Sequence, residues 1–390
     1  MAKGRLRIMI SAGEHSGDMH GAALVREASK SRPDMTFFGL GGDMMEAAGV
    51  ELKAHLRETA VMGLTEVLGA LGRVLKVRSL MTKLITSDRP DALVLIDSPD
   101  FNFTLAKAAH KAAVPVIYYI CPQIWAWRPR RLNFLRDFTT RRALIFPFEA
   151  DFYRQHNVQA DLVGHPLLDE LPVYFERQAI LKDLGIEPGR PILAILPGSR
   201  KSVASKLAAP MLGAVDILLK SFPDLVAIVP RAAALNRSYL ESLLSQASSQ
   251  VKKALKVVDG RSQEILAVAS AALLASGTST VEGAVLGTPM VVTYRVSALS
   301  FWLARLLVKV PFVSIANLVA KRQIVPELLQ SRCRADELAL AIAPLITESS
   351  TRKEMIDNLK AVASSLGGPG ASARVLELID RAIGDKSVRT

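Results

Sequence analysis

Near its amino terminus the sequence reads LRIMISAGEHSGD, residues 6–18. An apolar run ends here in a turn with two glycines, and a helical pattern follows directly. This order is typical of a strand that leads into the first crossover of a parallel sheet. Glycines let a ligand approach the backbone, and the N–H groups of the following helix point toward the same place. The stretch predicts an α/β fold with a ligand site at its first turn.

Strand and helix patterns alternate along the rest of the chain, which predicts two doubly wound parallel sheets in tandem. A charged segment with three prolines, residues 168–191, is the expected seam, and residues 334–383 look mostly helical. Two such domains would place a cleft between two sets of strand ends. The expected strands are residues 6–11, 36–40, 92–96, 114–120, 143–146 and 161–163 in the first half and 192–196, 226–229, 256–258, 272–274 and 290–293 in the second.

Composition narrows the function. The net charge of +12 favours an anionic partner: nucleic acid, a membrane surface or a phosphorylated substrate. Two distant cysteines, Cys121 and Cys333, exclude a disulfide scaffold and a cysteine-bound zinc site and fit the cytosol. No dinucleotide fingerprint, Walker loop or paired histidine motif is present, so we expect no metal. The longest uncharged run, residues 265–281, is too short and polar to span a membrane, and we expect no signal peptide.

Two strand ends in the first half carry titratable side chains. Glu14, Ser16 and Asp18 lie among the glycines of the first turn, where they can bind a ligand, although Ser16 or Asp18 can equally cap the helix. Asp97 follows the strand at 92–96, and a carboxylate there can act as a general base worth about 10²–10⁴ in rate. The alternative is again a helix cap, since a proline follows closely.

Aromatic and basic residues gather after the strand at 114–120. Trp125 and Trp127 are two of the three tryptophans, and Arg128 follows them. Aromatic rings beside arginines suit a sugar that carries phosphate, or a membrane interface. Packing at an interface with a solvated basic rim explains the same pattern equally well.

Two strand ends in the second half suit a nucleotide. Ser199 and Arg200 follow the strand at 192–196, and an arginine can hold a diphosphate through two parallel hydrogen bonds. The turn Ser276-Gly277-Thr278 opens a helix, so its N–H groups can bind phosphate, and Glu282 can accept hydrogen bonds from ribose hydroxyls. A helix start rich in Ser and Thr is also common without a ligand.

Two segments suit a membrane surface. Leucines and valines follow helical spacing over residues 64–84 with basic residues among them, and residues 299–309 are more apolar still. Basic amphipathic helices lie in the headgroup region of a bilayer. A helix that packs on a core and exposes its other side to water gives the same pattern.

Seven motifs stand in order along about residues 6–380. They are Ala12-Gly13-Glu14 with Ser16-Gly17-Asp18, Ala60-Val61-Met62-Gly63 with Glu66-Val67-Leu68, Ile96-Asp97-Ser98-Pro99-Asp100-Phe101-Asn102, Trp125-Ala126-Trp127, Leu196-Pro197-Gly198-Ser199-Arg200, Ala275-Ser276-Gly277-Thr278 and Pro326-Glu327-Leu328-Leu329-Gln330. One such motif would be weak, but this ordered set closely resembles the bacterial lipid-A-disaccharide synthases.

The resemblance implies a GT-B glycosyltransferase fold of two Rossmann-like domains. These are residues 1–170, completed by a C-terminal helix at residues 361–390, and residues 171–360. It implies inverting transfer, without metal or cofactor, of 2,3-diacylglucosamine from UDP-2,3-diacylglucosamine to the 6-hydroxyl of lipid X. The products are the β-1,6-linked disaccharide 1-phosphate and UDP. The family is peripheral on the cytoplasmic face of the anionic Gram-negative inner membrane.

The resemblance also assigns roles to residues. Asp97 becomes the catalytic base, in preference to Asp100. On the nucleotide side stand Ser199, Arg200, Ser276, Gly277, Thr278, Glu282, Asn317, Glu327 and Gln330. On the acceptor or cleft side stand Gly13, Glu14, Ser16, Gly17 and Asp18, and we place Trp125 and Arg128 there too.

The sequence departs from the family pattern in one place. The family usually has an acidic residue three positions after Arg200, whereas this chain has Val203. Either that carboxylate is dispensable or donor binding is altered. The alternatives are a UDP-N-acetylglucosamine 2-epimerase or another UDP-sugar glycosyltransferase. We expect no nucleic-acid partner, since no such motif accompanies the arginines, and an oligomer is compatible with the sequence.

Overall fold

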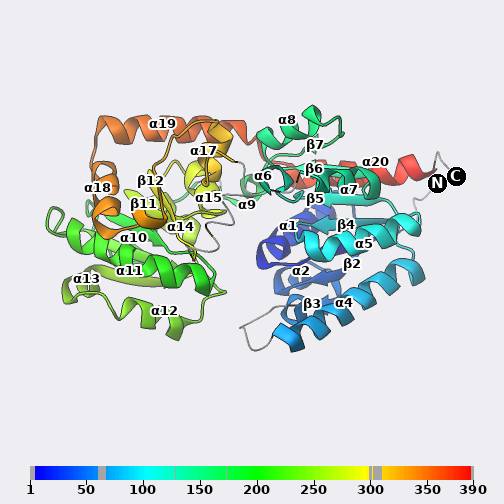
Figure 1. Cartoon of the computed structure of the whole chain (residues 1–390), viewed down its shortest axis with the longest axis horizontal. Helices are drawn as coiled ribbons and strands as arrows, with labels where there is room; N and C mark the ends of the chain where they lie inside the picture. Colours follow the sequence, from blue (N-terminus) through cyan, green and yellow to red (C-terminus); the bar gives the residue numbers. More distant parts are fainter. Residues whose placement is uncertain are drawn as a thin grey trace. The chain divides into compact units, whose positions relative to one another are not determined.

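Two parallel sheets, each with helices on both faces, organise the computed structural model (Figure 1). The structure describes all residues except 1–4, 60–66, 128, 173, 298–300, 302–309 and 388–390. The chain divides into a first unit, Met1–Glu170 with Leu366–Thr390, and a second unit, Leu171–Ser365. The prediction of two doubly wound α/β sheets in tandem is confirmed.

The sheet of the first unit has the order β3-β2-β1-β4-β5-β6-β7, and every paired strand is parallel. Strand β4 is buried along its whole length, which is why it reads as a continuous apolar run. The sequence did not predict β3, because this edge strand is charged and largely half-exposed. The strands are β1 (Leu6–Ala12), β2 (Met35–Gly41), β3 (Glu51–His55), β4 (Ala92–Ile96), β5 (Val116–Tyr119), β6 (Arg141–Leu144) and β7 (Asp161–Leu162).

Alternate residues of these strands pack against different helices. Met9 and Leu93 belong to one core cluster with Met81 and Leu105, which come from α4 and α5. On another side α1 packs against α2 and α20. The helices of the unit are α1 (His15–Ser31), α2 (Asp43–Ala47), α3 (Leu56–Thr59), α4 (Val67–Ser87), α5 (Pro99–Lys111), α6 (Ile124–Trp127), α7 (Arg131–Phe138), α8 (Pro147–Gln155), α9 (Leu167–Glu170) and α20 (Ala371–Ser387).

The last helix, α20, belongs to the first unit, where it packs on α1 and on β4, β5 and β6 (Figure 1). The Asp169 carboxylate accepts hydrogen bonds from the backbone N–H groups of Gly370 and Ser372, and so caps the start of α20. Residues 361–365, expected with the first domain, belong to the second unit, because α19 continues to Ser365.

The sheet of the second unit has the order β10-β9-β8-β11-β12-β13, again parallel throughout. The sequence did not predict the three-residue β13, which pairs with β12 at the edge of this sheet. The strands are β8 (Ile192–Leu196), β9 (Val226–Arg231), β10 (Leu255–Asp259), β11 (Ala271–Ala275), β12 (Met290–Tyr294) and β13 (Glu327–Leu329).

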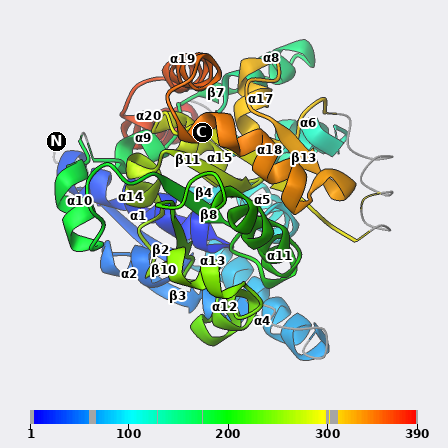
Figure 2. The ribbon, with the colours of Figure 1, turned by 90° about the vertical axis from the view of Figure 1, so that its left-hand side faces the viewer.

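Helices α11 and α18 of the second unit pack side by side (Figure 2). The helices of this unit are α10 (Arg177–Asp183), α11 (Lys201–Leu218), α12 (Arg237–Leu244), α13 (Ser249–Ala254), α14 (Ser262–Val268), α15 (Ser279–Val285), α17 (Ile315–Ala320), α18 (Ala335–Ile346) and α19 (Ser350–Ser365), with a 3₁₀ turn η1 (Gln330–Arg332).

Each sheet has one point at which its strand order reverses. In the first unit this point lies between β1 and β4, and in the second it lies between β8 and β11. Ligands of doubly wound folds bind outside the carboxyl ends of the strands at such points. The topology therefore directs attention to the turns after these four strands.

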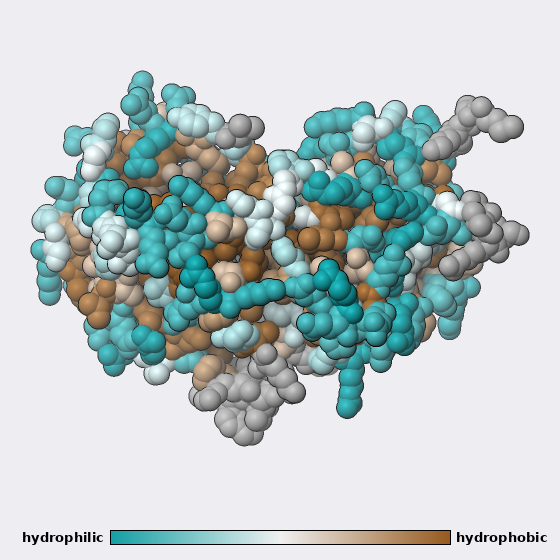
Figure 3. All heavy atoms as spheres, turned by 90° about the horizontal axis from the view of Figure 1, so that it is seen from above, coloured by the Kyte–Doolittle hydropathy of each residue, from teal (hydrophilic) through white to brown (hydrophobic). Residues whose placement is uncertain are grey.

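On the face shown in Figure 3, hydrophilic side chains predominate, and apolar side chains show between them in patches. None of the helices in the described ranges is long and apolar enough to cross a bilayer.

Candidate active site

A strained turn follows β4. Asp97 and Ser98 both have φ of 45°, in the left-handed region that residues with a side chain rarely adopt. The surrounding structure holds them there. The Asp97 carbonyl accepts hydrogen bonds from Asn102 Nδ2 and from the Tyr118 hydroxyl, both at 2.8 Å. The Asp97 side chain is half-buried at this turn.

Asn102 forms hydrogen bonds to both strands of the first switch point, β1 and β4. It is fully buried, and its Oδ1 accepts a hydrogen bond from Ser11 Oγ at 2.8 Å, while its Nδ2 also donates to the Ile96 carbonyl. Asn102 stands in one of the seven motifs, but its pattern predicted no role for it. The signal was its place in the first turn of the helix that follows the strand, where a side chain can bond back to the backbone.

Two predicted glycines lie at close contacts. A Cβ on Gly13 would lie 2.2 Å from Ser98 Oγ, so only glycine lets the turn after β1 lie against the turn after β4. A Cβ on Gly17 would lie 3.2 Å from that of Ala12, which brings α1 close to its own strand. Glu14 is exposed at the N-cap of α1, and Ser16 is half-buried.

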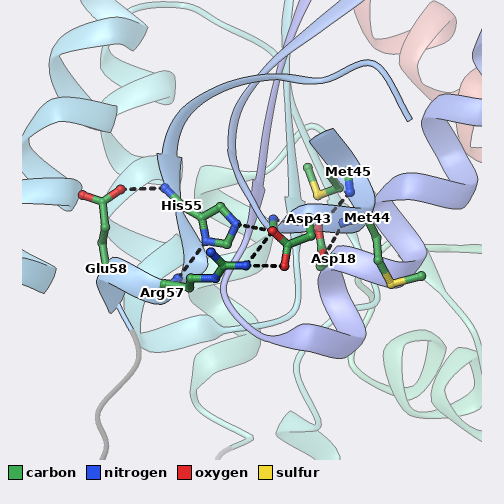
Figure 4. A network of polar contacts seen from close by, with 8 residues as sticks. Asp18, Asp43, Met44, Met45, His55, Arg57 and Glu58 are labelled. Atoms are coloured by element: carbon green, nitrogen blue, oxygen red, sulfur yellow. Dashed lines mark hydrogen bonds and ion pairs between the residues drawn. The ribbon is translucent and has the colours of Figure 1, made fainter. Parts of the chain in front are cut away.

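Asp18 is a buried structural residue, capping a helix other than its own (Figure 4). Its carboxylate accepts hydrogen bonds from the N–H groups of Gly42 at 2.7 Å and of Met44 and Met45 at 3.1 Å. These groups open α2, so Asp18 caps that helix. Only 2% of Asp18 is exposed, so the structure places it behind the surface where the sequence expected a ligand contact.

Trp125 is held by a buried carboxylate. Its Nε1 donates a hydrogen bond to Glu149 Oε1 at 3.0 Å, and Glu149 Oε2 accepts from the N–H groups of Ile145 and Phe146. Burial raises the pKa of Glu149 to about 7, and the charge of Asp97 acts in the same direction. The sequence gave no signal for Glu149, because only the fold brings α8 beside Trp125. Arg128 lies outside the described residues.

The second switch point uses glycines. Gly198 and Gly277 have φ of 103° and 149°, so the turns after β8 and β11 need residues without a side chain. Ser199 and Arg200 are exposed, and Arg200 is the N-cap residue of α11. Val203, which replaces the family's usual acidic residue, lies against Gly198. That position is therefore held by an apolar contact.

Ser276 and Thr278 flank Gly277 in the turn after β11. Ser276 Oγ donates a hydrogen bond to the Val313 carbonyl at 2.7 Å, and Thr278 is exposed at the N-cap of α15. Glu282 lies half-buried in the first turn of α15. The structure thus brings Ser276, Thr278 and Glu282 to one strand end.

The remaining residues of the predicted nucleotide side bond mainly to the chain itself. Asn317 is fully buried and bonds to Glu327, whose carboxylate also accepts from backbone N–H groups at 313 and 314. Gln330 Oε1 accepts from the Val296 N–H at 2.9 Å. Among the described residues, no three His, Cys, Asp or Glu side chains gather as metal ligands, and both cysteines are free and buried.

The comparison with protein families decides between the alternatives. The family model of lipid-A-disaccharide synthetase matches residues 8–371. The chain belongs to this family. The lipid-A-disaccharide synthase of Myxococcus xanthus is 39% identical over 373 residues, covering 96% of each chain. That of Geobacter sulfurreducens is 38% identical over 378 residues, covering 97% of each chain.

Solved structures show the fold. UDP-GlcNAc 2-epimerase from Neisseria meningitidis, bound to UDP-GlcNAc, has a TM-score of 0.68 at 12% identity and covers 96% of this chain and 100% of its own. Acinetobacter baumannii MurG has a TM-score of 0.58 at 14% identity and covers 97% of this chain and 99% of its own. Solved structures of such low identity show the GT-B fold alone. The match to the lipid-A-disaccharide synthetase family shows the activity. The chain is therefore a glycosyltransferase, and the epimerase alternative is not favoured.

Proposed function

We propose that the chain transfers 2,3-diacylglucosamine from UDP-2,3-diacylglucosamine to the 6-hydroxyl of lipid X. The acceptor oxygen forms a bond to the anomeric carbon on the face opposite UDP, and the bond from that carbon to the diphosphate breaks. The configuration inverts. The products are the β-1,6-linked disaccharide 1-phosphate and UDP.

The strained turn at Asp97 is the observation that carries this proposal. Strained backbone persists only where surrounding contacts over-determine it, and it clusters at active sites. Here Asn102 and Tyr118 hold the backbone of Asp97, while its side chain stays half-buried at the switch point. In the proposed reaction Asp97 accepts the proton of the 6-hydroxyl as that oxygen attacks.

The second unit supplies groups suited to the leaving diphosphate. Arg200 is exposed two residues after Gly198, and Gly277 follows the carboxyl end of β11, a strand that pairs with β8 in the same parallel sheet. Negative charge grows on the diphosphate as the bond breaks, and fixed donors stabilise it without reorganisation. We propose that Arg200 and this turn replace a metal ion in that role.

Helix α4 suits a peripheral contact with the anionic inner membrane. Its Met81 and Ile85 are buried in the core, but Leu71 and Leu75 are 53% and 42% exposed. Arg73 stands between these two leucines and is exposed. Apolar anchors beside basic residues bind anionic lipid surfaces. We propose that this segment holds the enzyme at its acylated substrates; of the second apolar segment, residues 299–309, only Phe301 is described.

A mixed-micelle assay tests the proposal. Purified protein is incubated with UDP-2,3-diacylglucosamine and lipid X in the presence of EDTA, and UDP and disaccharide are followed by mass spectrometry. We expect equal amounts of UDP and disaccharide. UDP without disaccharide would point to hydrolysis or epimerisation instead, and turnover abolished by EDTA but restored by added metal would refute the metal-free step.

A further inference from the structure

Asn317 has its whole hydrogen-bonding capacity used inside the protein. Its Oδ1 accepts from the N–H groups of Ile324 and Val325 at 2.8 and 3.0 Å. Its Nδ2 donates to the Val325 carbonyl at 3.0 Å and to Glu327 Oε1 at 2.8 Å. No part of the side chain is exposed. Asn317 therefore cannot touch a nucleotide, although the family pattern places it on that side.

Glu327, the hydrogen-bond partner of Asn317, also accepts hydrogen bonds from two consecutive backbone N–H groups. Its Oε1 also accepts from the Ser314 N–H and its Oε2 accepts from the Val313 N–H, both at 2.9 Å. The carboxylate thus fixes residues 313 and 314 against β13. Charge-assisted bonds of this kind are about twice as strong as neutral ones.

Val313 connects Glu327 to the turn after β11 through a hydrogen bond to Ser276. Its carbonyl accepts the hydrogen bond from Ser276 Oγ at 2.7 Å, while the Ser276 N–H donates to the Thr293 carbonyl of β12 at 3.0 Å. The serine is therefore fixed from two sides. Gly277, with its φ of 149°, follows directly, so this chain of bonds ends at the turn proposed to bind the diphosphate.

We propose that Asn317 and Glu327 are positioning residues, which act on UDP through Val313 and Ser276 and not by contact. The inference rests on the proposed function, because it takes the Ser276 turn as the diphosphate site. A turn held in its binding conformation before the ligand arrives binds more tightly, since less ordering remains to be done.

A double-mutant cycle in UDP affinity tests this inference. Glu327→Gln puts an NH₂ group opposite one of the backbone N–H groups, and Ser276→Ala removes the bond to Val313. We expect each change to weaken UDP binding about five- to tenfold in calorimetry. Both substitutions break the same chain of contacts. The double variant should therefore bind UDP as tightly as the single variant with the lower affinity. Losses that multiply would show independent contacts with UDP and would overturn the inference.

Three further measurements complete the test. Ser276→Thr keeps the hydroxyl and should recover most of the affinity. Ser279→Ala removes a neighbouring hydroxyl that donates to the Ala275 carbonyl, and this variant should bind UDP like the wild type. If Glu327→Gln does not fold, the Ser276 variants decide: unchanged affinity in Ser276→Ala overturns the inference. A wild-type protein that binds no UDP would instead refute the proposed donor, and this inference with it.

Discussion

The two units share one topology but build their switch points from different residues. After β4 the chain places Asp97 and Ser98, which carry side chains, in left-handed conformations, whereas the second unit uses Gly198 and Gly277. A left-handed residue with a side chain costs about 1–2 kcal/mol, and glycine avoids most of that cost. In the proposed reaction, the strained turn of the first unit presents a carboxylate, and the glycine turns of the second unit bind an anion. The topology decides where a site forms, and the residue at the turn decides its chemistry.

The carboxylate of the first unit should give the largest effect. Asp97→Asn keeps the size of the side chain but removes the proposed base, so we expect kcat to fall by about 10²–10⁴. The measurement is kcat in the micelle assay, with circular dichroism to confirm folding. The matched control is Asp100→Asn, because Asp100 is exposed and paired with Arg131. Near-wild-type turnover in Asp97→Asn, or an equal loss in Asp100→Asn, would contradict the assignment.

The arginine of the second unit should come next. We expect Arg200→Ala to lower kcat/KM by about 10², and Arg200→Lys to recover only part of it, because lysine lacks the planar fork. Arg237→Ala on α12 removes a surface arginine paired with Glu241 and serves as the control. If lysine restored full activity, charge alone would explain the role of Arg200.

The strain of the first switch point can be tested through its restraints. Asn102→Ala removes the bonds that hold Asp97 and leaves the buried Ser11 hydroxyl without its partner. We expect the free energy of unfolding to fall by about 2–3 kcal/mol and kcat to fall with it. In the second unit, Asn236→Ala removes an exposed helix cap and should cost about 1 kcal/mol. Equal losses in urea denaturation would show that the first switch point is not specially restrained.

The buried carboxylate beside Trp125 predicts a pH effect. The pKa of Glu149 is raised from 4.5 to about 7, so between these values the folded protein binds more protons than the unfolded chain. The free energy of unfolding should therefore fall as pH rises. Between pH 5 and 8 we expect the wild type to lose about 2 kcal/mol more than Glu149→Gln. Glu46→Gln, an exposed substitution in the same unit, should follow the wild type; parallel curves for all three proteins would refute the effect.

The smallest effect concerns α4. Leu71→Ser with Leu75→Ser should weaken binding to vesicles of anionic phospholipid by about two- to tenfold, because less apolar surface enters the headgroup region. Co-sedimentation measures it. In the second unit, Leu340→Ser removes a leucine that is 79% exposed, and it should leave vesicle binding unchanged. A loss equal to that of the α4 variant would refute the special role of α4.

Much of the fold could be predicted because parallel strands are buried on both faces. Strands such as β4 and β8 therefore appear as unbroken apolar runs. Strands β3 and β13 could not be predicted this way, because each lies at an edge and is short or charged.

The site was partly predictable. The places of Asp97 and Gly277 at strand ends could be predicted, and their roles stay proposals. The bonds of Asp18 and Asn317 could not be predicted from the sequence, because each side chain bonds to backbone groups that only the fold brings near. The contact of Glu149 could not be predicted for the same reason, because its partner Trp125 comes from another helix.

The return of α20 has a consequence for biosynthesis. The first unit is interrupted in sequence, with all of residues 171–365 inserted before its final helix. On the ribosome, at about 5–20 residues per second, that insertion takes on the order of 10–40 s to make. During this time the surface of α1 and β5 that later receives α20 has no cover. The second unit is continuous and can finish folding first, so the half that carries Asp97 is the last to be completed.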